Sequence, residues 1–305
     1  MGRGSTEKNE FKNAHRNTQG NLIKEWIAEY SPKNEEDILD ALREIMQEIT
    51  LAALSRTDFF EKAGFYGGTA LRIFYGLDRF SEDLDFSLLE VDEAFMLEPY
   101  FSAILTEFES LGIKVSIKEK EKVQQSSIES AFLKTETIWK ELVLEDVVKQ
   151  TGVTSNKPIK IKIEVDRRPP LGFKTEEKLL IRPFSFYVKC FTRPCLFAGK
   201  LHALLYRKWN NRVKGRDWYD LEWYIKKGIP LDVGHFLSRA KDTGDWEADE
   251  ITREQIIELL KNKIDSVSFS SIKDDVVRFI KDDQSLSIWS ASYFKDLVEK
   301  MKFES

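Results

Sequence analysis

Two aspartates occupy alternate positions of one short segment, DLDF, at residues 83 to 86. Because side chains alternate along a β-strand, Asp83 and Asp85 are expected on one face of a sheet, with their apolar neighbours in the core. Two carboxylates so close repel each other, and a cation between them relieves that cost. Mg²⁺ suits such an all-oxygen site, especially where phosphates complete its shell. An isolated pair of this kind is more often a solvent-exposed, charged strand edge. The residues around the pair therefore decide whether it is a metal site.

A double glycine precedes the aspartates and leads into a predicted short helix, Ala70 to Tyr75. Without side chains, Gly67 and Gly68 allow backbone N–H groups to approach a phosphate closely. The first amides of a helix favour an anion, and Thr69 is expected to cap this one. A phosphate cradle beside a pair of metal-binding carboxylates is a fairly specific combination.

A third carboxylate is needed to complete a site that activates a hydroxyl. The clearest strand of the chain runs from Pro158 to Asp166, where isoleucine and valine alternate with charged residues. Glu164 lies between two apolar residues of this strand and is the first choice. Asp166, on the same face, is its rival.

A basic segment follows the predicted sheet. Lys200 and Arg207 are seven residues apart and therefore share one face of a predicted helix. The segment could hold a triphosphate, a nucleic-acid backbone or both, although the chain has a formal net charge of −5. Pairing of Asp217 with a lysine or arginine is the structural alternative. The basic residues are Lys200, Arg207, Lys208, Arg212, Lys214 and Arg216.

The composition excludes several classes of protein. The 305 residues are 42% hydrophobic and 32% charged, as in ordinary globular proteins. Cys190 and Cys195 make no disulfide framework, and with three histidines they make no zinc site, so a reducing cytoplasm is expected. No apolar run approaches the roughly 18 residues of a membrane-spanning helix. The chain has no P-loop, dinucleotide fingerprint or nucleophile elbow.

The elements that must position these residues divide the chain into parts. We expect a disordered tail over residues 1–20, an α/β domain over 21–192 and a helical domain over 193–305. Residues 118–134 have no clear pattern. In the α/β domain we expect helices at 34–62 (ended by Gly64), 70–75 and 95–111, and strands at 84–89, 113–117, 135–144, 158–166 and 184–191.

In this order the motifs resemble the AbiEii/AbiGii-type toxins, within the DNA-polymerase-β-like nucleotidyltransferase superfamily. That family has a GGTAL turn, an R-x-S-x-D-h-D-h segment, a lysine on the first helix after the sheet, and then RD-x-x-D-L. Here these are Gly67 to Leu71, Arg79 to Phe86, Lys200, and Arg216 to Leu221. The resemblance spans roughly residues 60 to 225. It implies an α+β fold: a polymerase-β-like core, with a mixed sheet flanked by helices, and an α-helical C-terminal domain.

The resemblance also implies an activity and its partners. Family members transfer a nucleotide from an NTP, often to the 3′ end of tRNA, and have a winged-helix antitoxin that need not bind them stably. Two Mg²⁺ ions would be held by Asp83, Asp85 and Glu164, although the family's third carboxylate is usually an aspartate. Asp217 would orient Lys200 or Arg207. The NTP would be contacted by Gly67, Gly68, Thr69, Arg79, Ser81, Lys200 and Arg207.

Two other functions stay open at this point. A nucleotidyltransferase that modifies a small molecule such as an aminoglycoside would need an acidic pocket, and the basic segment argues against it. A non-catalytic module that binds a nucleotide or an antitoxin is the other alternative, and the intact Asp83, Asp85 and Lys200 argue against it. A purely structural adaptor would leave the paired carboxylates unexplained.

Overall fold

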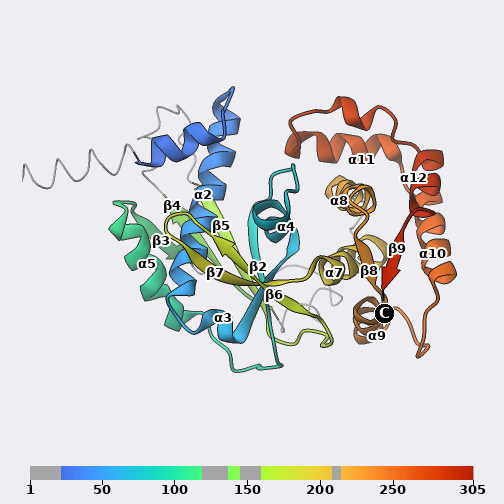
Figure 1. The fold of residues 1–305 in the computed structure, drawn as a ribbon, viewed down its shortest axis with the longest axis horizontal. Coiled ribbons are helices and arrows are strands. Elements are labelled where there is room, and N and C mark those ends of the chain that lie inside the picture. The colour runs from blue at the N-terminus through green and yellow to red at the C-terminus, as the bar shows by residue number, and fades with distance from the viewer. Residues whose placement is uncertain (1–21, 119–136, 145–158, 208–213, 305) are drawn as a thin grey trace, which may run out of the picture.

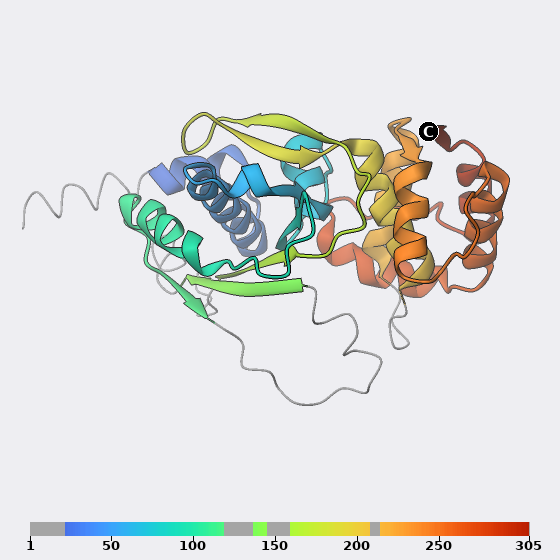
Figure 2. The ribbon, with the colours of Figure 1, turned by 90° about the horizontal axis from the view of Figure 1, so that it is seen from below.

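The structure, a computed structural model, describes residues 22–118, 137–144, 159–207 and 214–304. These residues form two lobes side by side, a sheet with helices packed on it and a bundle of helices (Figure 1). Figure 2 shows the helical lobe, in orange and red, as a separate block beside the sheet. None of the helices in the described ranges is both long enough and apolar enough to cross a membrane.

A seven-stranded mixed sheet forms the first lobe, in the order β3-β4-β5-β2-β1-β7-β6. The pairs β2–β5 and β1–β7 are parallel, and the other neighbours are antiparallel. The strands are β1 (Ala63–Tyr66), β2 (Asp83–Leu88), β3 (Val115–Lys118), β4 (Thr137–Leu144), β5 (Ile159–Asp166), β6 (Thr175–Leu180) and β7 (Phe186–Phe191).

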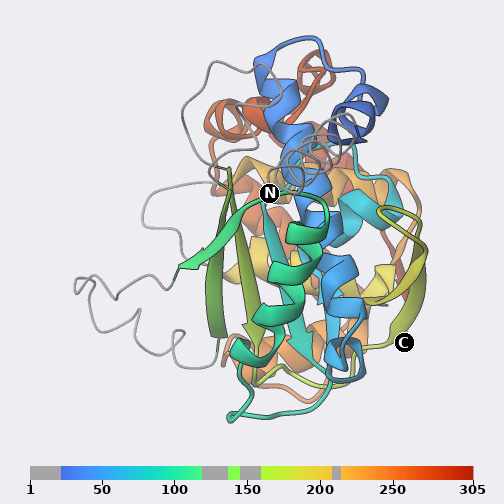
Figure 3. The same cartoon turned by 90° about the vertical axis from the view of Figure 1, so that its left-hand side faces the viewer.

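Helices cover the apolar face of this sheet. They are α2 (Glu35–Ser55), α3 (Phe59–Lys62) and α5 (Phe101–Ser110), and Figure 3 shows α2 and α5 crossing the same face. The apolar side chains of β5 and β2 are buried beneath them in one hydrophobic cluster. The charged side chains that alternate with them therefore lie on the opposite face, away from α2 and α5.

The second lobe has its own hydrophobic cluster, which also takes in Leu71 and Leu77. Leu71 belongs to α4 (Gly67–Tyr75), which lies between the sheet and the helical lobe (Figure 1). The glycine turn at the start of α4 is thereby held at the junction of the two lobes. The elements of this lobe are α7 (Arg193–Tyr206), α8 (Gly215–Lys226), β8 (Pro230–Asp232), α9 (Val233–Asp242), α10 (Arg253–Asp265), α11 (Phe269–Val276), α12 (Ala291–Val298) and β9 (Lys302–Glu304), with β8 and β9 paired in parallel.

The structure corrects two of the predicted helices. The helix expected over 34–62 is divided into α2 and α3. Asn34 caps α2, and its side-chain oxygen accepts from the backbone N–H of Asp37 at 2.9 Å. Gly64 does not end a helix but lies within β1, where an added Cβ would be 3.0 Å from the ring of Phe191. The helix expected over 95–111 is shorter, with a 3₁₀ turn (Glu98–Tyr100) before α5.

Four strands were not predicted: β1, which has four residues and ends at the glycine turn, and β6, β8 and β9. β6 reads TEEKLL, in which three consecutive charges hide the alternation, and it lies at the edge of the sheet. β8 and β9 have three residues each, too few for a periodic signal. The expected N-terminal tail and most of the ambiguous segment at 118–134 lie outside the described residues.

Candidate active site

The three candidate metal-binding carboxylates lie on the face of the sheet that α2 and α5 leave uncovered. β2 and β5 are parallel neighbours, and their register places Asp85 directly beside Glu164. Asp166 lies beside Ser87, one step beyond the pair of aspartates. The sheet therefore brings Asp83, Asp85 and Glu164 together, with Asp166 further along the same face.

Negative charge accumulates here without full compensation. Burial, together with the charges of Glu164 and Asp83, raises the pKa of Asp85 to about 7. Burial also raises the pKa of Asp83, and the ammonium of Lys162 opposes that rise. Lys162 pairs directly with Glu164. Perturbed carboxyls of this kind are typical of a site that binds a cation or handles a proton.

The donor set fits a magnesium ion that is held together with a substrate. Among the described residues, no three His, Cys, Asp or Glu side chains are arranged as a complete metal site. Mg²⁺ is usually bound through one or two carboxylates, while phosphates and water supply the other ligands. Asp83 and Asp85 would hold the ion in this way. Glu164 would join them on release from Lys162.

The glycine turn lies directly against the Asp85 carboxylate. Gly67 has φ +83°, and a Cβ on it would collide with Oδ2 of Asp85. A Cβ on Gly68 would lie 2.9 Å from Nη2 of Arg79 and from Oγ of Ser81. The helix begins at Gly67 rather than after Thr69, so the N-terminal turn of α4, with its free amides, lies beside the Asp85 carboxylate on a backbone that only glycine allows to come so close.

Thr69 differs from its expected role. It lies inside α4 and does not cap it, and its hydroxyl donates to the backbone carbonyl of Asp83. This hydrogen bond fastens the start of α4 to the start of β2. The backbone N–H groups of the turn are therefore better phosphate donors than the Thr69 hydroxyl, whose proton is already used.

Arg79 has a structural role that the sequence did not predict. Its Nε and Nη2 donate to the two carboxylate oxygens of Asp220 at 2.6 and 2.7 Å, and its Nη1 donates to the carbonyl of Phe80 at 3.0 Å. The side chain is only 2% exposed. These three bonds use three of the five N–H donors of the guanidinium, and a contact of Arg79 with a triphosphate stays a prediction. Arg79 itself joins the two lobes.

Lys200 belongs to the same buried network. Its Nζ lies 2.9 Å from Oδ1 of Asp217 and 2.9 Å from Oδ2 of Asp220. Burial alone would lower the pKa of the Lys200 ammonium, but the two carboxylates outweigh burial and hold its pKa above the ordinary value. Asp217 therefore contacts Lys200, as its predicted orienting role requires.

Two further cations of the basic segment face the carboxylates. Arg207, the residue after α7, acts electrostatically on Asp85. Arg216, at the start of α8, acts on Asp83 and lies 3.7 Å from Glu82. Lys208 and Arg212 lie outside the described residues.

A family model confirms the relationship that these motifs predict. The model described as the nucleotidyl transferase AbiEii toxin, of type IV toxin–antitoxin systems, matches residues 49–300. The chain belongs to the AbiEii family. It is thus a toxin-type nucleotidyltransferase with the expected α+β fold, a mixed sheet flanked by helices. No curated protein sequence matches the chain significantly.

Two solved structures are similar to this AbiEii-family chain at low sequence identity. MenT4, a nucleotidyltransferase toxin from Mycobacterium tuberculosis H37Rv, is 17% identical, with a TM-score of 0.47, over 92% of this chain and 87% of MenT4. JHP933 from Helicobacter pylori is 14% identical, with a TM-score of 0.46, over 85% of this chain and 90% of JHP933.

Several residues of this AbiEii-family site were not found from the sequence. Nε2 of the buried Gln47, on α2, donates to the backbone carbonyls of Ser81 and Glu82 at 3.1 and 3.0 Å, and so positions the approach to Asp83. Its neighbours at helical spacing include Glu44 and Thr50, so no break in an apolar stripe signalled it. Asp220 was visible as part of the RD-x-x-D-L motif, but its two basic partners were not.

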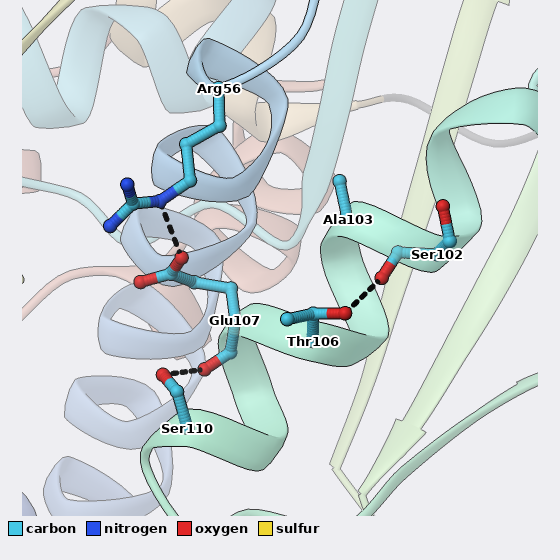
Figure 4. A pocket seen from close by; sticks show the side chains of 6 residues that line it. All are labelled: Arg56, Ser102, Ala103, Thr106, Glu107 and Ser110. Carbon is cyan, nitrogen blue, oxygen red and sulfur yellow. Dashed lines mark hydrogen bonds and ion pairs between the residues drawn. The ribbon is translucent and has the colours of Figure 1, made fainter.

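A hollow elsewhere on the same lobe is separate from this site. It is lined by Arg56, at the end of α2, and by Ser102, Ala103, Thr106, Glu107 and Ser110 of α5 (Figure 4). Arg56 pairs there with Glu107 at 2.8 Å. Because α2 and α5 cover the apolar face of the sheet, this hollow lies on the opposite side from the carboxylates.

Alanine at Gly67 is expected to destabilise the protein and to displace Asp85. The positive φ costs about 1 kcal/mol for a residue with a side chain, and the collision with Asp85 adds roughly 1–3 kcal/mol. Urea unfolding measures the loss. Gly76→Ala is the matched control, because Gly76 has φ +76° but, among the described residues, no atom within 4 Å of an added Cβ. Equal losses of stability in the two variants would show that the collision with Asp85 contributes nothing to the free energy of unfolding.

Proposed function

We propose that this AbiEii-family protein transfers a nucleotide from a magnesium–NTP complex to the 3′ end of tRNA and releases pyrophosphate. The observation that supports this most is the contact between the glycine turn and Asp85. A helix N-terminus favours an anion and a pair of carboxylates favours a cation, so a metal–triphosphate complex would suit this contact.

The triphosphate would lie between the glycine turn and the basic residues of the helical lobe. The N–H groups of Gly67 and Gly68 would donate to phosphate oxygens at the positive end of the α4 dipole. An ammonium has three donors, of which Lys200 gives two to its carboxylate partners, so the third is left for a phosphate. Arg207 would add a second positive charge, and Ser81 would line the turn.

The acceptor hydroxyl would attack the α-phosphorus, and the bond to the bridging oxygen of the pyrophosphate would break. Two magnesium ions, when bound with the NTP, would neutralise the triphosphate and lower the pKa of the attacking hydroxyl. Glu164 lies beside Asp85 and would accept the proton of that hydroxyl. Asp83 and Asp85 would fix the position of the α-phosphate, which supplies most of the acceleration in phosphoryl transfer.

Membership of a toxin family supports the choice of acceptor and partner. A nucleotidyltransferase that halts growth needs an essential acceptor, and a tRNA acceptor end offers a free hydroxyl beside a polyanionic backbone. The basic segment around Lys200 suits such a backbone. We expect a neighbouring winged-helix antitoxin that controls the toxin without a stable complex, a role in phage defence, and a cytoplasmic location.

Incubation of the protein with each α-labelled NTP and total cellular RNA tests this function. We expect magnesium-dependent labelling of RNA of tRNA size with at least one NTP, and EDTA should abolish it. Labelling of an aminoglycoside but of no RNA would favour a small-molecule enzyme. Magnesium-dependent NTP binding without transfer to any acceptor would favour a non-catalytic module.

A further inference from the structure

The chain from Phe80 to Asp83, which leads into β2, has its backbone carbonyls held by side chains. Asp83 is the first residue of β2, and the three residues before it belong to no helix or strand. Each of the four carbonyls nevertheless accepts a hydrogen bond from a side chain, and the donor to Phe80 is Arg79. Strand carbonyls are normally satisfied by neighbouring strands, so side chains do that work here.

Two buried side chains supply the other three bonds. The side-chain amide nitrogen of Gln47, on α2, carries two hydrogens and donates to the carbonyls of Ser81 at 3.1 Å and Glu82 at 3.0 Å. The hydroxyl of Thr69, on α4, donates to the carbonyl of Asp83. Gln47 is 1% exposed and Thr69 is 0% exposed. We call Gln47 and Thr69 the carbonyl clamp.

The two helices that carry the carbonyl clamp are fastened to each other. Nε of Arg72, on α4, lies 2.7 Å from Oε2 of Glu44, on α2, and both side chains are largely buried. Glu44 is three residues before Gln47 and therefore lies on the same side of α2. The two donors of the clamp are thus held at a fixed spacing, and so are the carbonyls that they bind.

The position of Asp83 depends on the clamp more than that of Asp85 does. Asp85 lies between two strands, opposite Tyr66 of β1 and beside Glu164 of β5, so the sheet fixes its backbone on both sides. β1 ends at Tyr66, and among the described strands Asp83 has a neighbour only in β5. The carbonyl clamp replaces the strand that is missing beside Asp83.

We infer that Gln47 is a positioning residue for the nucleotidyl transfer, which fixes the chain entering β2 so that the carboxylates of Asp83 and Asp85 can bind one cation together. This inference rests on the proposed function and adds a residue that acts through the backbone. Both hydrogens of the Gln47 amide are engaged by carbonyls, so the residue would contact neither metal nor NTP through them. Residues that orient metal ligands typically contribute about 10- to 100-fold to metal affinity or activity.

The variant Gln47→Met tests this role, because methionine is about as long as glutamine but donates no hydrogen bond. We expect kcat to fall about tenfold or more, while the KM for NTP at saturating magnesium changes less than about threefold. The affinity for Mn²⁺ alone, measured by titration and electron paramagnetic resonance, should fall about tenfold. Mn²⁺ suits the same oxygen ligands as Mg²⁺, so it reports on the carboxylate pair without NTP or RNA.

Thr50→Val is the matched control for the loss of a buried hydrogen bond. Thr50 lies on the same helix and is 0% exposed, and its hydroxyl donates to the carbonyl of Met46, within α2, at 2.8 Å. This variant should lower the melting temperature but leave kcat and Mn²⁺ affinity unchanged.

Thr69→Val removes the other donor of the carbonyl clamp. It should weaken Mn²⁺ binding as Gln47→Met does. The double variant of Gln47 and Thr69 should lose less than the product of the two single effects, because both side chains act on one segment.

The inference and the proposed function fail in different ways. If Gln47→Met is less stable but keeps the wild-type kcat and Mn²⁺ affinity, Gln47 has only a structural role, and the inference is wrong while the nucleotidyl transfer stands. If Gln47→Met does not fold, Thr69→Val decides, and an unchanged Mn²⁺ affinity in that variant would overturn the inference. A wild-type protein that labels no RNA contradicts the proposed function, and the Mn²⁺ titration still tests the clamp. A wild-type protein that binds no Mn²⁺ would overturn the inference as well.

Discussion

Asparagine in place of Asp85 is expected to reduce nucleotide transfer by more than about a thousandfold and, at the same time, to stabilise the folded protein above pH 7. The substitution keeps the shape of the side chain but removes its charge. A site without that charge holds magnesium poorly, so transfer is lost. A labelled-NTP assay with RNA measures the first effect, and urea unfolding measures the second.

The gain in stability follows from the direction of the pKa shift. The Asp85 carboxyl has an ordinary pKa of 3.8, and burial with its acidic neighbours raises it to about 7 in the folded protein. Between these values the folded protein keeps a proton that the unfolded chain has released, so this group makes stability fall as the pH rises through that window. Asparagine has no such proton. The variant should therefore exceed the wild type in stability at pH 8 by a few kcal/mol, and by little at pH 4.

The control for this prediction is an exposed aspartate. Asp249 is 94% exposed and pairs with Lys241, so Asp249→Asn should leave both transfer and stability unchanged. Transfer by purified Asp85→Asn at the wild-type rate would exclude the proposed mechanism. A variant that is less stable than the wild type at pH 8 would instead show that Asp85 is ionised and well paired in the folded protein.

Asparagine in place of Asp220 is expected to destabilise the protein by roughly 3–5 kcal/mol. Asp220 is fully buried and accepts from both Arg79 and Lys200. Removal of its charge leaves two buried cations with one carboxylate, that of Asp217, close enough to pair with Lys200. A loss of stability of this size at one position would distinguish the ion-pair network that joins the two lobes from an ordinary surface ion pair. Urea unfolding at pH 7 measures the loss.

The surface pair of Lys62 and Asp58 provides the comparison for Asp220. These two charges lie 2.7 Å apart, and about half of each side chain is exposed. Asp58→Asn should leave the unfolding midpoint almost unchanged, because water screens the pair. A similar small effect for Asp220→Asn would show that Arg79 and Lys200 find other acceptors, and that the two lobes are not held together at this point.

Local pattern by itself determined much of the molecule. The alternation of apolar and charged residues predicted β5 within one residue of its observed start and put Glu164 and Asp166 on one face. The DLDF segment predicted paired carboxylates, and the double glycine predicted a helix start close by, although α4 begins at Gly67 rather than at Ala70. These features depend on residues close in sequence. The two-residue alternation of a strand and the conformational freedom of glycine are therefore sufficient to reveal them.

Only the tertiary structure decided which charges meet. Arg79 and Asp220 are 141 residues apart, and no local period shows that they pair. The register of two parallel strands, rather than either strand alone, placed Glu164 beside Asp85 and Asp166 one step beyond. Which charged side chains pair depends on how the sheet and the helical lobe pack together, and that packing is set by the whole chain.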